Sequence, residues 1–234
     1  MTHAPSPPDR WRLLRYCAYA LAAEGGVQAL YQAVIAYGPG IAVENGALEL
    51  LQIAVALAGG AALVAAGAVT QRGLTAIAFC AGALLYAAAR EADLWFEQVA
   101  FDDAYKYLAG VPIAAAAAAV AWRDRRRWAE SLEWTAHPAS VFFLCGGLQV
   151  VVAAALFDRS RLWDSIENSV QADRVKRLVE ESIELSGYLT LAAGACELLI
   201  TCRREAAAAS RAARQTDSAS HAAADDSPPA AVAA

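Results

Sequence analysis

The sequence predicts an all-α integral membrane protein, a bundle of about six transmembrane helices with both termini in the cytoplasm. The chain of 234 residues is 58% hydrophobic and 18% charged, whereas soluble domains are about 45–50% apolar and about 25% charged. The apolar residues are concentrated in blocks, several of them near the roughly 20 residues that a membrane-spanning helix needs. Arginines gather beside alternate ends of these blocks, which indicates an even number of spans.

Six apolar blocks are expected to cross the membrane. The fourth block is short and almost pure alanine, a residue that favours helix but is only weakly apolar. The alternative, a soluble alanine-rich bundle, should show a charged stripe along each helix. Residues 53–69 and 141–157 carry no charge on any face, which argues against that alternative. The predicted spans are residues 13–37, 46–69, 73–99, 107–122, 137–157 and 181–201.

The membrane domain is expected to cover residues 11–202, with a tail at each end. Residues 1–10 are rich in proline and are predicted to be disordered, and the sequence leaves open whether this N-terminus is cleaved. Residues 203–234 contain mainly alanine, serine, aspartate and proline without large apolar side chains. Such a composition cannot bury enough apolar surface to fold, so a disordered tail is expected there.

The segment between the last two spans, residues 158–179, has an amphipathic pattern. Trp163, Ile166 and Val170 follow the i, i+3, i+7 spacing of one helical face, and charged residues lie elsewhere. We therefore expect an amphipathic connector that leads into the sixth span, and an ordinary connecting helix is an equally good interpretation.

Positive charge predicts the orientation of the chain. In short loops, lysine and arginine collect on the cytoplasmic side. Only an even number of spans places all the arginine groups on one side, so six spans and two cytoplasmic termini agree with one another. This pattern is that of a multi-pass protein of the bacterial inner (cytoplasmic) membrane. The arginines of that side are Arg10, Arg12, Arg15, Arg72, Arg123, Arg125, Arg126, Arg127, Arg203 and Arg204.

Acidic residues gather at the opposite, outer ends of the second, third and sixth spans. Although they are far apart in the sequence, the predicted topology places them at one membrane depth. Ionisable groups at such depth usually face the interior of the bundle, paired or near water. We expect an outward-facing acidic site with Glu49, Arg90, Glu91, Asp93 and Glu184 as its core and Glu44, Lys106, Glu180 and Glu181 as its rim.

Three short motifs carry a family resemblance. Residues 44–49 read E-[DN]-G-x-x-E, residues 90–93 read R-E-x-D, and residues 180–184 read E-E-x-x-E. In this order at helix ends, they resemble uncharacterised bacterial multi-pass inner-membrane proteins. The resemblance implies the membrane fold and the acidic site but no established activity. Residues 94–96 contain no histidine, unlike some proteins of that group, which argues against a histidine-containing metal site.

The acidic site suggests a cation or proton as its ligand. Seven acids face two bases there, more negative charge than internal pairing neutralises. If a metal binds, its ligands are expected from Glu49, Glu91, Asp93 and Glu184, and a divalent cation is the one candidate cofactor. The same residues are also compatible with a structural or accessory role, in which the charges form an internal network.

The alternative function is a membrane-embedded, metal-dependent hydrolase acting on lipid or a lipid-linked substrate. The three histidines fit neither an HExxH zinc site nor a Ser-His-Asp triad, so a hydrolase of those classes is excluded. The net charge of −5 does not favour binding to nucleic acid. The expected partner is the lipid bilayer, and the sequence names no protein partner.

Reporter fusions test the predicted topology. Because residues 123–127 contain four arginines, this loop should stay in the cytoplasm, so a β-galactosidase fusion there should be active and an alkaline phosphatase fusion inactive. Fusions at residues 100–106 should give the reverse result. Phosphatase activity from the 123–127 loop would contradict the six-span orientation.

Overall fold

The computed structural model of the chain describes residues 10–38, 41, 46–157, 163 and 169–225. Every regular element in these residues is a helix. The predicted all-α class is therefore confirmed. Four helical stretches are long and apolar enough to cross a membrane, which agrees with the predicted membrane protein. The four stretches are Ala47–Thr70, Leu74–Glu91, Ala139–Phe157 and Asp173–Gln215.

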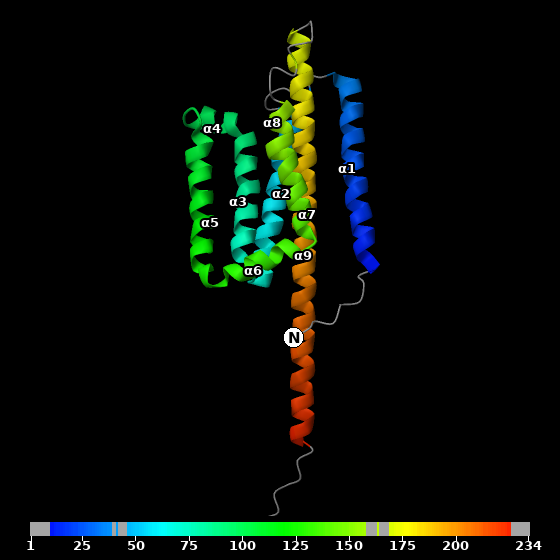
Figure 1. The fold of residues 1–234 in the computed structure, drawn as a ribbon, viewed down its shortest axis with the longest axis vertical. Helices are drawn as coiled ribbons and strands as arrows, with labels where there is room; N and C mark the ends of the chain where they lie inside the picture. Colours follow the sequence, from blue (N-terminus) through cyan, green and yellow to red (C-terminus); the bar gives the residue numbers. More distant parts are fainter. Residues whose placement is uncertain (1–9, 39–40, 42–45, 158–162, 164–168, 226–234) are drawn as a thin grey trace, which may run out of the picture.

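The long helices lie side by side along one common axis (Figure 1). Helix α2 (Ala47–Thr70) and helix α3 (Leu74–Glu91) form an antiparallel pair joined by a short turn. Helix α9 (Ser169–Asp225) runs through the bundle and contacts α1 (Arg10–Tyr37), α2 and α7 (Ala139–Leu148). Helix α9 is therefore the element that connects the two halves of the chain.

Two further rods complete the bundle. The π-helical turn η2 (Lys106–Gly110) continues directly into α5 (Val111–Arg123), which packs beside α3. A second π-helical turn, η5 (Gln149–Ala153), joins α7 to α8 (Ala154–Phe157). Neither α1 nor the η2–α5 rod is among the four stretches that are both long and apolar enough to cross a membrane, although the 28 residues of α1 span about 42 Å at 1.5 Å per residue.

Different short helices lie at the two ends of the bundle. Helix α4 (Asp93–Val99) lies at one end, called the α4 end (Figure 1). At the other, the α6 end, η3 (Arg125–Arg127), α6 (Trp128–Glu133) and η4 (Trp134–Ala136) connect α5 to α7.

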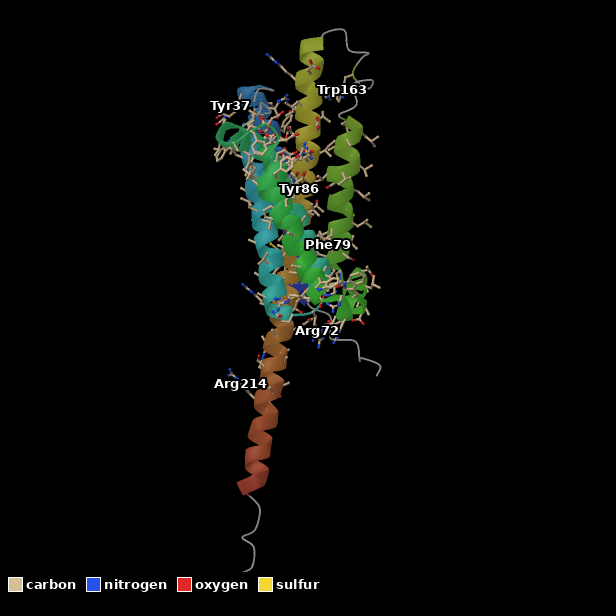
Figure 2. The ribbon with its side chains drawn as sticks, turned by 90° about the vertical axis from the view of Figure 1, so that its left-hand side faces the viewer. Tyr37, Arg72, Phe79, Tyr86, Trp163 and Arg214 are labelled. Atoms are coloured by element: carbon tan, nitrogen blue, oxygen red, sulfur yellow. The ribbon has the colours of Figure 1, made fainter. Side chains whose placement is uncertain are left out.

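The outward side chains of the rods are apolar between these ends. Val64, Phe79 and Leu144 are each more than half exposed. Figure 2 shows oxygen and nitrogen atoms gathered near Tyr37 at one end and near Arg72 at the other, with mainly carbon around Phe79. A soluble protein rarely exposes so wide an apolar band, whereas the band is typical of a membrane-spanning bundle.

The predicted third span, residues 73–99, needs correction. Helix α3 ends at Glu91, the backbone leaves the helix at Ala92 (φ −96°, ψ 15°), and α4 begins at Asp93. The backbone N–H of Leu94 donates to Asp93 Oδ1 over 2.6 Å, so the aspartate side chain bonds at the start of α4. The apolar residues 94–96 hid this break in the sequence because they extend the hydrophobic run past it.

The predicted disordered tail also differs from the structure. Helix α9 continues without a break to Asp225 and projects far beyond the α6 end (Figure 1). Residues 203–225 are rich in alanine, the strongest helix former, so they continue a helix that the bundle has already nucleated. Much of the predicted 158–179 connector lies outside the described residues, and its part from Ser169 onward already belongs to α9.

Small residues allow α9 to approach its neighbours closely. An ideal Cβ added at Gly187 would lie 2.5 Å from Val150 Cγ2 and 3.1 Å from Gly146 O, and one at Gly194 would lie 2.8 Å from Phe142 Cβ. Such close backbone approach is the usual way in which helices associate in membranes. Gly187 and Gly194 thus form a close seam between α7 and α9, whereas Gly147 has nothing within 4 Å of its ideal Cβ.

Alanine substitutions at two glycines test the seam. The change Gly187→Ala should destabilise the folded protein by about 1–3 kcal/mol because the new methyl group overpacks against α7. The matched change Gly147→Ala should be neutral or stabilising by up to about 1 kcal/mol, since alanine favours helix over glycine. Unfolding in mixed detergent micelles measures both, and equal losses in the two variants would contradict the packing described here.

Candidate functional site

Three carboxylates from two helices converge near the α4 end. Glu91 is the last residue of α3, and Glu181 and Glu184 lie three residues apart on α9. A spacing of three places both α9 side chains on one helical face, from which Glu184 reaches Arg90 of α3 and Glu181 reaches Gln52 of α2. One oxygen atom from each of these three carboxylates lies within 4.8 Å of the others. These three residues are called the carboxylate triplet below.

Each carboxylate of the triplet has a different hydrogen-bond donor. The Tyr188 hydroxyl donates to Glu91 Oε1 over 2.9 Å, and Arg90 Nη2 donates to Glu184 Oε1 over 3.0 Å. Gln52 of α2 donates from Nε2 to Glu181 Oε2 over 2.8 Å and to the Glu181 backbone carbonyl over 2.9 Å. Three helices therefore hold the triplet in place.

The triplet is mostly shielded from solvent. Gln52 and Tyr188 are fully buried, and Glu184 is only 3% exposed. The Glu91 side chain is 7% exposed, whereas the side chain of Arg90 is 46% exposed and reaches the carboxylates from the rim. Carboxylates in such surroundings need an opposite charge or a proton, because an uncompensated buried charge is very unfavourable.

The positive charge beside the triplet is too small to balance three ionised carboxylates. Arg90 is the one cation that forms ion pairs with the triplet in the described part of the chain, at 3.0 Å to Glu184 and 3.9 Å to Glu91. In addition, Gln52 Oε1 is buried and has no hydrogen-bond partner among the described residues. The site thus has surplus negative charge and an unused amide oxygen beside it.

The structure brings some of the sequence-predicted residues to this place and leaves others apart. Arg90, Glu91, Glu181 and Glu184 meet, so Glu181, predicted as rim, belongs to the centre. Glu49 is half-buried in the first turn of α2, three residues before Gln52.

Asp93 lies beyond the break at Ala92 and bonds to the N–H of Leu94. Lys106 pairs with Asp103 over 2.6 Å, and this hydrogen bond raises the pKa of the exposed Lys106 ammonium. Glu180 is half-buried one residue before the triplet's Glu181, and Glu44 lies outside the described residues. Asp93 and Lys106 thus bond elsewhere.

Sequence reasoning did not place Gln52 and Tyr188 in the site. Tyr188 follows Glu184 by four residues and Glu181 by seven, so helical spacing could have found it. Gln52 follows Glu49 by three, and an amide within an apolar run is a comparable signal. Neither residue could be assigned to the site from the sequence, because uncharged polar residues are also common in helices that carry no functional site.

A second buried carboxylate was also missed. Glu197 lies near the end of the last apolar run, is 2% exposed, and accepts two hydrogen bonds of 2.8 Å from Arg15 Nε and Nη2. Tyr19 adds a third at 3.4 Å. Because an ionisable residue inside a span is costly without a partner, this pair joins α1 to α9. Arg15 therefore has a structural role in addition to its contribution to the predicted topology.

The chain matches no family model, no curated protein and no solved structure. The resemblance to uncharacterised inner-membrane proteins therefore rests on the three motifs alone.

A double-mutant cycle on Arg15 and Glu197 tests the pair that joins α1 to the bundle. Arg15→Gln leaves the Glu197 carboxylate buried without its cation and should destabilise the protein by about 3–5 kcal/mol. Adding Glu197→Gln should recover most of this loss. The control Arg12→Gln changes an exposed arginine whose side-chain hydrogen bond, within the described residues, goes to Tyr16 of the same helix, and it should stay within about 0.5 kcal/mol.

Thermal or denaturant unfolding of the purified chain measures the two single variants Arg15→Gln and Glu197→Gln, their double variant and Arg12→Gln. Additive effects of the Arg15 and Glu197 changes would show that the pair contributes no coupling energy. A loss for Arg12→Gln as large as that for Arg15→Gln would show a general effect of positive charge on α1.

Proposed function

We propose that this chain is a cation-binding membrane protein and that the carboxylate triplet holds a divalent cation. The observation that carries the proposal is the convergence of three carboxylates, one buried (Glu184) and two half-buried (Glu91 and Glu181), with oxygens within 4.8 Å of one another. Within the described residues, one arginine forms ion pairs with them. A divalent ion would neutralise the two negative charges that Arg90 leaves, whereas proton binding would have to neutralise two carboxylates separately.

The donor atoms favour a hard cation. Calcium, magnesium and manganese prefer carboxylate and carbonyl oxygens, and the triplet supplies only carboxylates. Gln52 Oε1 adds an amide oxygen without a partner among the described residues. Hydrogen bonds from Tyr188 to Glu91 and from Arg90 to Glu184 orient these two carboxylates. Soft metals such as zinc are usually held with the help of histidine or cysteine, and neither is part of the triplet.

The proposal includes six membrane crossings with both termini on the arginine side. Helix α1 and the η2–α5 rod lie along the same axis as the four long apolar stretches (Figure 1), which supports counting them as spans. The arginines of residues 123–127 then lie in the cytoplasm and the triplet lies near the outer face of a bacterial inner membrane. The lipid bilayer surrounds the bundle in this arrangement.

Cation binding is favoured over a purely structural charge network by the contrast with Glu197. That carboxylate is matched by one arginine in a two-bond pair, whereas the triplet has one arginine for three carboxylates. The hydrolase alternative needs a positioned acid or base in addition to the metal. Arg90 and Tyr188 already bond to the carboxylates, so no observation favours that chemistry.

Metal analysis of the purified chain tests the proposal. After removal of metals with a chelator, equilibrium dialysis against Mn²⁺, Ca²⁺ or Mg²⁺ should leave one ion per chain in the wild type. The double variant Glu181→Gln, Glu184→Gln should lose it, because neutral amides replace two charged ligands. Tyr188→Phe removes the bond that orients Glu91 and should weaken binding about 10–100-fold.

Asp93→Asn is the matched control, since Asp93 is an acid of the same motif that bonds elsewhere. It should retain the ion. Loss of the ion in this control as well would indicate diffuse charge at the α4 end in place of the triplet. If the wild type binds no ion and infrared spectra show protonated carboxyl groups that vanish in the double variant, the ligand is the proton and the divalent proposal is wrong.

A further inference from the structure

Arginines line a surface cavity at the α6 end, opposite the carboxylate triplet. The cavity has a volume of about 520 Å³ and lies where the turn between α2 and α3 meets the end of α5. Its walls combine three guanidinium groups with two apolar side chains. The lining residues are Gln71, Leu74, Val120, Arg123, Asp124, Arg126 and Arg127.

The one acid in this lining is already used by the fold. Asp124 is 7% exposed and its Oδ2 accepts from the backbone N–H of Thr75 over 3.2 Å and from the Thr75 hydroxyl over 3.1 Å. Asp124 thereby bonds to the first turn of α3, where an anion is favoured by the helix dipole. It forms no ion pair with the cavity's arginines within the described residues.

The arginines of the cavity retain unused hydrogen-bonding capacity. Across the residues that the structure describes, Arg123 and Arg126 have no carboxylate within 4 Å, and Arg127 Nε reaches Glu130 Oε1 only at 3.9 Å. Arg127 also donates a long bond of 3.4 Å to the Gln71 carbonyl. The cavity therefore presents a net positive charge from fork-shaped donors, which match the geometry of a phosphate group.

The surroundings place the cavity at the level of lipid headgroups. Trp122 and Trp128 flank this end of α5 and are 70% and 57% exposed, and exposed tryptophans are enriched where a membrane meets water. Leu74 and Val120 make part of the wall apolar. A ligand that carries an anionic group beside an apolar part fits such a wall better than a free ion does.

From these observations we infer that the cavity binds the phosphate headgroup of an anionic membrane lipid. The guanidinium groups of Arg123, Arg126 and Arg127 donate to the phosphate oxygens, and Leu74 and Val120 face the glycerol and the first part of the acyl chain. The site is independent of the carboxylate triplet and lies at the other end of the bundle. The arginine cluster of residues 123–127 would then bind a ligand in addition to holding this loop on one side of the membrane.

Native mass spectrometry of the full chain in detergent tests the inference. The probes are phosphatidylglycerol, phosphatidylcholine and water-soluble glycerol phosphate. The wild type should retain phosphatidylglycerol in preference to the other two. The variant Arg123→Gln, Arg126→Gln should bind phosphatidylglycerol about tenfold or more weakly, because it loses charge-assisted hydrogen bonds to the phosphate.

Arg125→Gln is the matched control. It removes one charge from the same loop, but Arg125 stacks on Trp122 at 4.7 Å and donates to the Trp122 carbonyl, and it does not line the cavity. This variant should bind phosphatidylglycerol like the wild type. If the double variant does not fold, the single change Arg126→Gln, compared with Arg125→Gln, makes the same test.

Three results would overturn the inference. Equal loss of binding in Arg125→Gln and Arg126→Gln would show diffuse attraction by the loop in place of a cavity. Equal retention of glycerol phosphate would make a soluble phosphate compound the ligand. Equal retention of phosphatidylcholine, which has no net charge, would show that the arginines do not select anionic lipid.

Discussion

The close approach of α9 to α2 and α7 is the constraint on which the rest of this structure depends. Glycines at the seam let the backbones pack with almost no side chain between them, as the Gly187 and Gly146 contacts show. This packing fixes the rotation of α9 about its axis. The rotation in turn decides that Glu181 and Glu184 face α2 and α3 and that Glu197 faces α1, so a packing constraint places the charges.

The two groups of buried charge on α9 have opposite balances. Glu197 has one arginine, two short hydrogen bonds and a tyrosine, and such a matched pair is sufficient to hold a helix against its neighbours. The carboxylate triplet has more negative charge than Arg90 supplies and lies at a bundle end that the apolar band does not cover. The first arrangement is a balanced structural pair, and the second is the observation on which the proposed cation site rests.

The arginine cluster shows the same principle at the other end. Asp124, buried beside Thr75, supports the fold and forms no ion pair with the neighbouring guanidinium groups among the residues that the structure describes. An acidic centre and a basic cavity therefore occupy the two ends of a rod whose middle is apolar. Each end offers charge to a ligand of opposite sign, and the apolar band keeps the two ends apart.

The sequence by itself determined the all-helical membrane class, because long uncharged runs cannot form the exposed surface of a soluble protein. It also determined that the acids of residues 90–93 and 180–184 lie near one end, since helices that alternate in direction bring such motifs to one depth. Only the tertiary structure decided which acids meet. Glu91 and Asp93 are two residues apart, yet the break at Ala92 sends one to the triplet and the other to α4. Likewise, periodicity could not pair Arg15 with Glu197, because contacts between distant helices depend on axial rotation and packing, which hydropathy does not encode.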